Sequence, residues 1–578
     1  MKSIYYRFLL AAFTIIAASV VAHARVVTIN LSSLGTTDVT EGLRQQLSSL
    51  TYSDKAIILL DKPGTFVLRG TVTGKCSVEM RGLGAEQSKI ELDNGANKGA
   101  FKAFTDDTFI EFTGTKEHPI SVDIMDLSIA LKEHHGYWWV EDHKNRSSSM
   151  QEKYAVKIYH ADRVNIERVN STMQNAVITN FNLRVCHNVT VKDCVITNYN
   201  NCYTGGNLWF QGEAKNVLVT NNKFYKYGND EALAFYAITT NAYDFKTQHP
   251  ADCEKSNISV TDNVFNYGYT GKGKFDIAND MLVNVSSIQN PNHRYGMHLK
   301  NFTFTGNVFN ISDIVKTELR FSFGSNDTHE SILVADNKFI NNALKTNHKF
   351  YKNDILVRDS SPSVKADTIM IRENMFVNNA DIVNPSDGAG LSHINMEGGT
   401  VNFVANQITN NVTTSSITGK ATGGQLLWAS SSGGFIKMRD NVCRGLCKIA
   451  SVMTSDGIND FTIEAYNNYF QGDTRIYCKK VKRLDLNFTG NTFKSNNMNF
   501  FLQEFAAEGS LTFNSNDVTA ANGQLMTHWD NKTSTNSMRF KHLEVKNNVF
   551  KGMSDERSVL TNCTNVKRRK VSGNSYRR

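Results

Sequence analysis

One strand-like pattern recurs along most of the chain, and it constrains the fold more than any other feature of the sequence. The pattern is a run of alternating apolar residues, a polar pair, Asn, one variable residue and an apolar or aromatic residue, as in VLVTNNKF (217–224). The Asn recurs at intervals of 23 to 44 residues, which indicates strands of constant length joined by loops of variable length. Cys194 takes the place of the Asn in the first repeat, and the later repeats carry Asn222, Asn263, Asn307, Asn337, Asn374, Asn406, Asn441, Asn468, Asn491, Asn516, Asn548 and Asn574.

The alternation of apolar and polar residues gives each strand one buried and one outward face. A buried Asn at a bend can hydrogen-bond to the chain above and below it, and it tolerates the left-handed backbone that a sharp corner needs. The aromatic residue two positions later is expected to fill the interior and to stack on its counterpart in the next repeat. The sequence therefore predicts an all-β fold, a single-stranded right-handed parallel β-helix. A β-propeller is disfavoured because it needs four strands and about forty regular residues in each blade.

Residues 1–24 have the pattern of a secretory signal peptide. A positively charged start is followed by an apolar run over 8–21, and a small-x-small cleavage pattern ends at Ala24. The apolar run is short for a membrane span, so an amino-terminal anchor is the less favoured alternative. We expect a mature protein of residues 25–578 that is secreted or periplasmic and forms one β-helix domain.

Residues 25–75 are expected to cap the amino-terminal end of the β-helix, because an open end exposes unpaired backbone groups. A short amphipathic helix should begin near Thr37 or Asp38 as N-cap, with Glu41 as the capping-box partner. Residues 56–68 then predict a strand, a Pro-Gly turn and a second strand. The apolar face of the helix would consist of Leu43, Leu47 and Leu50.

The net charge of the chain is small for its length and does not indicate nucleic-acid binding. The formal net charge is +8 over 578 residues, and a nucleic-acid-binding protein is expected to concentrate its charge on one face. Basic residues cluster only near the carboxyl terminus, at 567–570 and 577–578, where a solvated final strand is favoured over a binding tail. No stretch after the signal is long and apolar enough to span a membrane, and a monomer is favoured.

Nine cysteines are an odd number for an exported chain, so at least one is free or pairs between molecules. Cys186, Cys194 and Cys202 lie on neighbouring repeats, and Cys443 and Cys447 lie close together in the sequence. Neither group has the spacing of a zinc site. Buried free cysteines are the favoured interpretation, and a disulfide within either group is the open alternative.

A second strand precedes each Asn-containing strand, and its outward residues are basic, aromatic and amide-bearing. In 155–160, for example, Val156 and Ile158 should point inward, and in 180–185 Phe181 and Leu183 should do the same. Such a strip offers cations for carboxylates and aromatic faces for sugar rings, so a polyanionic sugar chain is the expected partner. The expected outward set is Lys157, Tyr159, Asn182, Arg184, Trp209, Gln211, Tyr236, Arg320, Ser322 and Arg358.

Long insertions surround this strip, and loops on a rigid scaffold often carry binding residues. The segment 133–146 contains His135, Trp138 and Trp139, which we expect to contribute to substrate binding. An equally good interpretation is that the two tryptophans fold onto the side of the β-helix and seal it.

The amino-terminal segment resembles the start of many pectate-lyase-like β-helix proteins, which begin with an Asp- or Thr-led helix, a strand and a Pro-Gly-(Thr/Tyr)-(Phe/Tyr) turn, here 63–66. The Asn-x-Phe repeats are similar to the same superfamily over nearly the whole mature chain. The resemblance implies the fold but not the reaction, because the superfamily contains lyases, hydrolases, epimerases, phage depolymerases and members without known activity. The export signal and repeats also resemble proteins exported by polysaccharide-degrading Bacteroidetes.

A β-eliminating lyase needs a base near C5 of a uronic acid and a group that neutralises the carboxylate. Calcium-dependent lyases of the resembled superfamily use Lys or Arg as the base, which implies Lys157 and Arg184, 27 residues apart. Calcium ligands would come from Asn182, Glu213, Asp230 and Glu231. The fuller acidic strand and base motif of the alginate and chondroitin lyases is missing.

A glycoside hydrolase needs two carboxyl groups about 5–10 Å apart. Asp230 and Glu231, with Glu213 near them in sequence, are the candidate catalytic carboxyl groups. The polygalacturonase pattern of paired Asp, Gly-His-Gly and Arg-x-Lys is absent, which disfavours that family. The alternative for Lys157 and Arg184 is a pair of solvated surface cations, and the alternative for the acidic pair is a polar turn.

These observations leave two classes of function. The first is an exported carbohydrate-active enzyme acting on an acidic polysaccharide, with a lyase somewhat ahead of a hydrolase and with calcium as a candidate cofactor. The second is a non-catalytic glycan-binding or surface-structural β-helix. A basic aromatic strip fits both, whereas a convergent acid–base set would favour only the enzyme.

Overall fold

The computed structural model describes most of the chain after the expected signal peptide. It describes residues 24–93, 108–132, 153–174, 178–199, 206–227, 231–236, 254–268, 281–286, 296–312, 315–342, 352–361, 369–380, 391–413, 424–430, 433–501, 506–527, 539–560 and 566–578. The expected signal peptide, apart from Ala24, lies outside the described residues.

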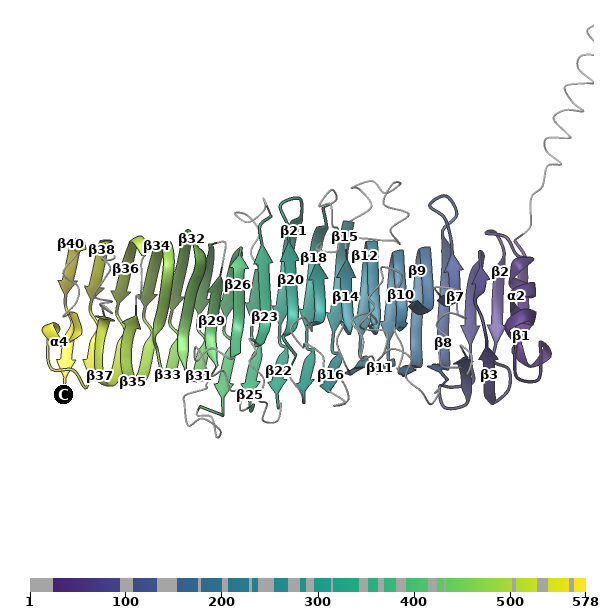
Figure 1. Ribbon diagram of the computed structural model, residues 1–578, viewed down its shortest axis with the longest axis horizontal. Coiled ribbons are helices and arrows are strands. Elements are labelled where there is room, and N and C mark those ends of the chain that lie inside the picture. Colours follow the sequence, from purple (N-terminus) through teal and green to yellow (C-terminus); the bar gives the residue numbers. More distant parts are fainter. Residues whose placement is uncertain are drawn as a thin grey trace, which may run out of the picture.

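The strands stack side by side into a long rod, with the amino-terminal helix at one end and the last strands at the other (Figure 1). Every strand pairing in the described chain is parallel and joins segments about one coil apart in sequence. This is the right-handed parallel β-helix that the repeat predicted. Each coil contributes to three stacks of strands, which we call A, B and C, and several long strands bend through a corner and join two stacks.

Stack A carries the residues of the candidate site. Its strands are β4 (Val72–Gly74), β7 (Thr108–Thr113), β9 (Lys153–Gln174), β10 (Ile178–Lys192), β12 (Leu208–Thr220), β14 (Leu233–Tyr236), β17 (Met281–Ser286), β20 (Thr317–Phe323), β23 (Lys352–Asp359), β26 (Leu391–Gly398), β29 (Gln425–Ser430), β32 (Lys448–Tyr466) and β34 (Ile476–Thr489).

Stack B holds the alternating apolar part of the repeat. Its further strands are β1 (Val26–Asn30), β2 (Lys55–Leu59), β5 (Ser77–Arg81), β8 (Ile120–Leu131), β15 (Glu254–Thr261), β18 (His298–Thr305), β21 (Thr328–Ala335), β24 (Ile369–Arg372), β27 (Thr400–Val404), β30 (Gly434–Arg439), β36 (Ala506–Asn514), β38 (Arg539–Lys546) and β40 (Val566–Ser572).

Stack C begins after the repeated Asn and holds the aromatic residue that follows it. Its strands are β3 (Gly64–Leu68), β6 (Ser88–Leu92), β11 (Val195–Tyr199), β13 (Lys223–Tyr227), β16 (Val264–Gly268), β19 (Val308–Ile311), β22 (Lys338–Asn341), β25 (Met375–Asn378), β28 (Gln407–Asn410), β31 (Val442–Leu446), β33 (Tyr469–Gly472), β35 (Thr492–Phe501), β37 (Asp517–Thr527), β39 (Val549–Lys551) and β41 (Ser575–Arg577).

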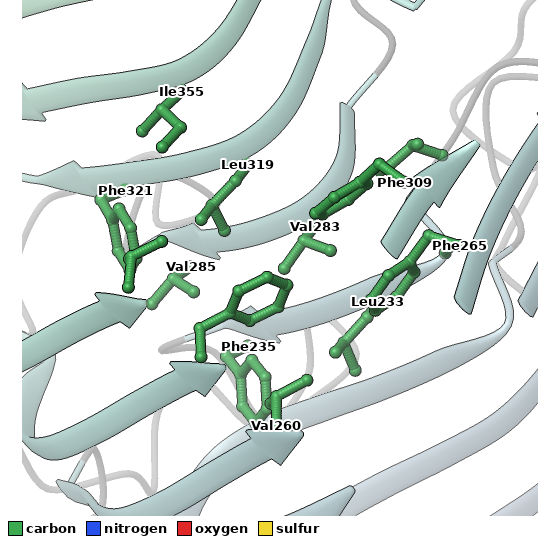
Figure 2. Packing of buried hydrophobic residues seen from close by; sticks show 14 of the residues in the cluster. Leu233, Phe235, Val260, Phe265, Val283, Val285, Phe309, Leu319, Phe321 and Ile355 are labelled. Atoms are coloured by element: carbon green, nitrogen blue, oxygen red, sulfur yellow. The ribbon is translucent and has the colours of Figure 1, made fainter. Parts of the chain in front are cut away.

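The repeated phenylalanines stack along the interior, as the sequence predicted. The ring centroids of Phe224 and Phe265, and of Phe265 and Phe309, are 5.0 Å apart, and the next two pairs through Phe339 to Phe376 are 4.8 Å apart. Figure 2 shows this aromatic stack beside aliphatic side chains from strands of the other stacks. Offset or stacked rings at this separation add to the free energy of burial, so the interior is one continuous core.

The repeated asparagines form a continuous hydrogen-bonded ladder at the corner between stacks B and C. From Asn222 to Asn548, each side-chain amide donates to the side-chain oxygen of the next Asn, and each backbone N–H donates to the same oxygen. Cys194 starts the ladder through its N–H, which donates to Asn222. The ladder satisfies the buried amides of successive coils, which explains why Asn is the constant residue of the repeat.

The corner has one feature that the sequence interpretation placed on the wrong residue. The left-handed backbone belongs to the residue before each Asn, such as Asp262, Asp336 and Ala405, with φ of 56°, 55° and 55°. Asn, Asp and Gly adopt this conformation at low cost, and the polar pair of the repeat supplies such residues in most coils. The Asn is therefore free to direct its side chain into the ladder.

We expect Ala405→Gly to raise the free energy of unfolding by about 0.5–1 kcal/mol, because Gly adopts positive φ without the steric cost of a Cβ. Gly306, Gly490 and Gly573 occupy the same place in other coils. Chemical denaturation monitored by far-UV circular dichroism would measure the change. An unchanged or lower stability would show that φ at this corner carries no strain.

The amino-terminal cap has the predicted elements, with one correction. The 3₁₀ turn Leu31–Ser33 precedes helix α2 (Thr40–Ser48), whose Leu43 and Leu47 are buried, and β2 and β3 flank the Pro-Gly turn. The N-cap residue is Val39, although Asp38 still accepts a hydrogen bond from the N–H of Thr40 at 3.0 Å. Glu41 pairs with Arg44 instead of completing a capping box. A short helix α4 (Glu556–Leu560) packs near the other end.

The described cysteines are all buried, as the favoured interpretation expected. Those that are free thiols include Cys76, Cys186, Cys194, Cys443 and Cys478, and Cys447 is buried as well. Burial raises the pKa of Cys186 and of Cys194 to about 12, which keeps them as thiols at neutral pH. Cys202 lies outside the described residues. Among the helices of the described chain, none is long and apolar enough to cross a membrane.

Candidate functional site

The side chains that point outward from stack A form two register columns, which we call the outer face. The pairing of β9, β10 and β12 aligns Lys157 with Asn182 and Trp209, and Tyr159 with Arg184 and Gln211. The first column continues through Ala234, Asn284, Arg320, Leu356, Asn395 and Trp428, and the second continues through Tyr236, Ser286, Ser322, Arg358 and Glu397. The predicted outward residues therefore share one face on consecutive strands.

The amino-terminal part of the outer face is packed on itself, which corrects the expectation of an exposed basic strip. Arg184 is 3% exposed, donates to the Tyr154 hydroxyl and the Asn182 side-chain oxygen at 2.6 Å each, and lies over the Tyr154 ring. The Asn182 amide in turn donates to Gln211 at 3.0 Å. Because its donors are engaged by buried partners, Arg184 serves to hold neighbouring strands together in this arrangement.

Lys157 is also engaged. Its ammonium lies 3.1 Å from Glu111, and its side chain is 14% exposed. Glu111 is the residue aligned with Lys157 on the preceding strand, β7. A catalytic base must be free to face the substrate, whereas the Lys157 ammonium is directed at Glu111. The ion pair therefore works against the role of base that the sequence implied for Lys157.

The aromatic residues of this part pack edge to face. The ring centroids of Trp209 and Tyr236 are 5.6 Å apart at 89°, and both side chains are fully buried. With Tyr154 and Ala234 they form a small apolar cluster separate from the main core. Their ring faces are therefore not open for a sugar to stack upon. Tyr159, the next aromatic residue of the outer face, contacts His160 with a centroid separation of 4.2 Å.

The structure does not bring Glu213 and Glu231 together. The backbone of Glu231 lies beside Gly206, two residues before β12 begins. Glu213 lies on β12 itself, seven residues after Gly206. β12 turns at Gly212 from stack A into stack B, so Glu213 lies beyond the corner. Asp230 lies outside the described residues, as do His135, Trp138 and Trp139. Within the described ranges, no group of three or more His, Cys, Asp or Glu is placed to hold a metal ion.

Each of the two glutamates has its own partners. The side chain of His187, 2.9 Å from Glu213, and that of Lys215, 2.8 Å away, lower the pKa of Glu213 to about 2 against the opposing effect of burial. Glu231 is 6% exposed and accepts a hydrogen bond from the Asn284 amide at 3.1 Å. Glu213 is therefore part of a surface ion cluster, whereas Glu231 belongs to the outer face.

The central part of the outer face, on β17, β20, β23 and β26, carries several buried polar atoms without a partner among the described residues. The side-chain oxygens of Asn284, Ser322 and Asn395 and the Nε of Arg320 are buried and lack a hydrogen-bond partner among the described residues. Native proteins rarely leave buried polar groups unpaired, so such a cluster needs an explanation in water or ligand binding. Arg320 donates from Nη1 to the sulfur of Met281 at 2.9 Å.

Two arginines lie next to each other here. Arg320 and Arg358 occupy neighbouring columns on the adjacent strands β20 and β23. Burial, and then the charge of Arg358, lowers the pKa of Arg320, while Glu231 and Glu397 act in the opposite direction. Arg358 is 44% exposed and donates from Nε to Glu397. Two like charges held close together favour an anion between them.

Sequence reasoning named Arg320 and Arg358 but missed their neighbours. Asn284, Ser286, Asn395 and Glu397 lie on strands 281–286 and 391–398, to which the alternation was not extended. The signal was present, since apolar Val283 and Val285 alternate with Asn284 and Ser286 in the same manner as in the strands that were recognised.

Comparison with known proteins finds similar solved structures but no matching family. No family model matches it, and no curated protein matches it. Among solved structures it is similar to an exopolygalacturonase from Thermotoga maritima, with 13% identity over 72% of this chain and 87% of that one and a TM-score of 0.38. It is also similar to a family 28 exopolygalacturonase from Yersinia enterocolitica, with 11% identity over 79% of each chain and a TM-score of 0.37.

A tailspike protein mutant of Escherichia coli bacteriophage HK620, in complex with a pentasaccharide, is 9% identical over 92% of this chain and 76% of that one, with a TM-score of 0.41. These are parallel β-helix proteins. Similarity at this level transfers no residue role to the outer face, and it does not bear on the resemblance to Bacteroidetes proteins.

Proposed function

We propose that the protein is exported and binds an acidic polysaccharide along the outer face of stack A. The observation that carries this proposal is the placement of Arg320 and Arg358 on adjacent strands, among buried polar atoms that lack partners in the described chain. Arginine presents a planar set of donors that matches a carboxylate. The signal-peptide pattern of residues 1–24 supports secretion or a periplasmic location.

Polysaccharide cleavage by β-elimination is the catalytic activity that fits this face best. The reaction needs a base at C5 and positive charge at the uronate carboxylate. Arg320 and Arg358, on adjacent strands of this face, would together supply the positive charge at the carboxylate.

Hydrolysis fits less well. Glu231 accepts a hydrogen bond from Asn284 on β17, and Glu397 pairs with Arg358 on β23, so protein partners already engage both carboxyl groups. A hydrolase needs two carboxyl groups about 5–10 Å apart that are free to act on the substrate. Non-catalytic binding remains the alternative because the same arginines would serve it.

A panel of uronic-acid polymers and neutral polymers would test the proposal. We expect the mature protein to bind at least one acidic polymer in affinity electrophoresis and to leave neutral polymers unretarded. A rise in absorbance at 235 nm would identify the unsaturated product of a lyase, and new reducing ends without that absorbance would identify a hydrolase. Absence of binding to every acidic polymer would refute the proposal, and binding without product would identify a binding protein.

Export is tested separately by the amino terminus of the protein recovered outside the cytoplasm. Mass spectrometry should find a chain that begins at Arg25, after cleavage following Ala24. An intact Met1 terminus on membrane-bound protein would favour the anchor.

A further inference from the structure

The unpaired polar atoms of the central outer face have a donor and acceptor pattern that defines a ligand. Asn284 donates its amide to Glu231, which fixes its side-chain oxygen as the free atom. The side-chain oxygen of Asn395 is also unpaired among the described residues. Amide oxygens only accept hydrogen bonds, so the missing partners of these two residues must be donors.

The arginines between these acceptors have the opposite requirement. Guanidinium groups only donate, and Nε of Arg320 is buried without a hydrogen-bond partner in the described chain. Arg358 uses its Nε for Glu397, while its two Nη groups make no hydrogen bond to a described residue. Ser322 lies between the two arginines in register and can donate or accept. The centre of the cluster therefore requires an acceptor, preferably an anion.

The register sets the order of these groups along the rod. Asn284, Arg320, Leu356 and Asn395 occupy one column on four successive strands, so the two amide oxygens lie on opposite sides of the arginines. Three strand spacings of about 4.8 Å give roughly 14 Å between the ends of this column. The order along the axis is acceptor, cationic donors, acceptor.

We infer that β17, β20, β23 and β26 form a subsite for a short stretch of an acidic oligosaccharide that runs along the rod axis. One sugar carboxylate binds at Arg320 and Arg358, and hydroxyl groups of the flanking sugars donate to the side-chain oxygens of Asn284 and Asn395. The inference rests on the proposed function and deepens it by naming the subsite and the ligand groups that each residue recognises.

Simpler ligands leave part of the cluster unsatisfied. A single inorganic anion offers acceptors for the arginines but no donors for amide oxygens on either side of them. A neutral sugar offers hydroxyl donors but no charge for the arginine pair. A molecule that carries a carboxylate between hydroxyl-bearing units satisfies both, and an acidic oligosaccharide has that composition.

The test uses the full mature chain, a polyuronate that it binds and the same polymer after carboxyl reduction to its neutral form. Arg358→Gln and Arg320→Gln should each weaken binding of the polyuronate at least tenfold, because each removes a charge-assisted hydrogen bond. Neither should change binding of the reduced polymer, which we expect to be weaker throughout. Asn395→Leu should weaken binding of both polymers by a similar factor, because it removes an oxygen that accepts a hydrogen bond from a sugar hydroxyl group.

Arg372→Gln is the matched control. Arg372 lies on β24 of the same coil, its side chain is also 44% exposed, and it also pairs with a glutamate, at 3.2 Å from Glu373. The control should bind like the wild type. Because Arg358 is partly exposed, its variant should fold even if the Arg320 variant does not, as circular dichroism would show.

The outcomes separate the two proposals. If no acidic polymer binds the wild type, both the proposed function and the subsite are refuted. If the polyuronate binds but carboxyl reduction has no effect, or if Arg358→Gln binds like Arg372→Gln, the subsite is refuted and acidic-polysaccharide binding elsewhere on the protein stands. Selective loss of the charged polymer in both arginine variants supports the subsite.

Discussion

At pH 8 and above, where Glu318 ionises, Lys352→Met is expected to lower the free energy of unfolding by about 3–5 kcal/mol, the effect of removing one partner from a buried ion pair. Lys352 and Glu318 are fully buried, and their charged atoms lie 2.6 Å apart. The contact is close but not aligned as a hydrogen bond, so its stabilisation is Coulombic. Asp354 lies 3.7 Å from the same ammonium. The variant would leave the Glu318 carboxyl group in the interior without this cation, whereas Asp354 keeps its contact with His393.

The effect should depend on pH with a definite sign. Burial raises the pKa of Glu318 to about 8, against the opposing effect of Lys352. A carboxyl group with a raised folded-state pKa contributes stability that is present below its unfolded value and lost as the pH rises through the folded value. Without Lys352 the pKa of Glu318 should rise further, so the destabilisation should be larger at pH 8 than at pH 5.

Chemical denaturation of the wild type and of Lys352→Met at pH 5 and pH 8 would measure both effects. The double variant Lys352→Met with Glu318→Gln is the control, since it removes the carboxylate as well and should recover part of the stability at pH 8. Equal destabilisation at the two pH values would contradict the account of Glu318.

Asn374→Leu, in the middle of the asparagine ladder, should also lower stability by about 3–5 kcal/mol. The Asn374 amide donates to Asn406 and to the carbonyls of Val334 and Arg372 at 3.0 Å each. Its side-chain oxygen accepts from the backbone and side-chain amides of Asn337 at 2.9 Å each. Leucine has a similar volume but leaves these buried donors and acceptors unpaired.

Asn574→Leu is the matched comparison at the described end of the ladder. Asn574 accepts two hydrogen bonds from Asn548 and donates one to Val545, at a partly buried position. Fewer and more exposed partners should limit the loss to about 1–2 kcal/mol. Both variants would be compared by denaturant titration, and equal losses at the two positions would argue that the ladder adds nothing beyond local contacts.

Much of the fold could be predicted because the repeat encodes interactions between identical positions. Asn222 forms a hydrogen bond with Asn263, and Phe224 stacks on Phe265. Each contact joins two residues of the same type, so finding that residue at the same position of every coil is enough to predict the contact. The interior ion pair could not be read in this way. Nothing in the pattern of apolar residues around Glu318 or Lys352 indicates that a charged side chain is buried there. Each of the two residues also finds its partner on another coil.

The sequence predicted which side chains of the site point outward, but not which of them are accessible to a ligand. Alternation identified Asn182 and Arg184 as outward residues, but it could not show that long side chains on neighbouring strands satisfy one another. Tyr154 illustrates the reason, because Ala155 and Val156 both belong to the core. This breaks the alternation and lets the Tyr154 hydroxyl reach Arg184. Such local packing decides which polar side chains remain without a protein partner, and the periodicity of the sequence gives no information about it.

Arginine footprinting tests the central claim, that an acidic polysaccharide binds on the outer face, most directly. An arginine-specific dicarbonyl reagent would be applied with and without an acidic oligosaccharide, and modification would be read by mass spectrometry. Arg358 and Arg372 have equal side-chain exposure on one coil. We predict that the oligosaccharide protects Arg358 and leaves Arg372 reactive. Equal modification of Arg358 with and without bound oligosaccharide would contradict the account.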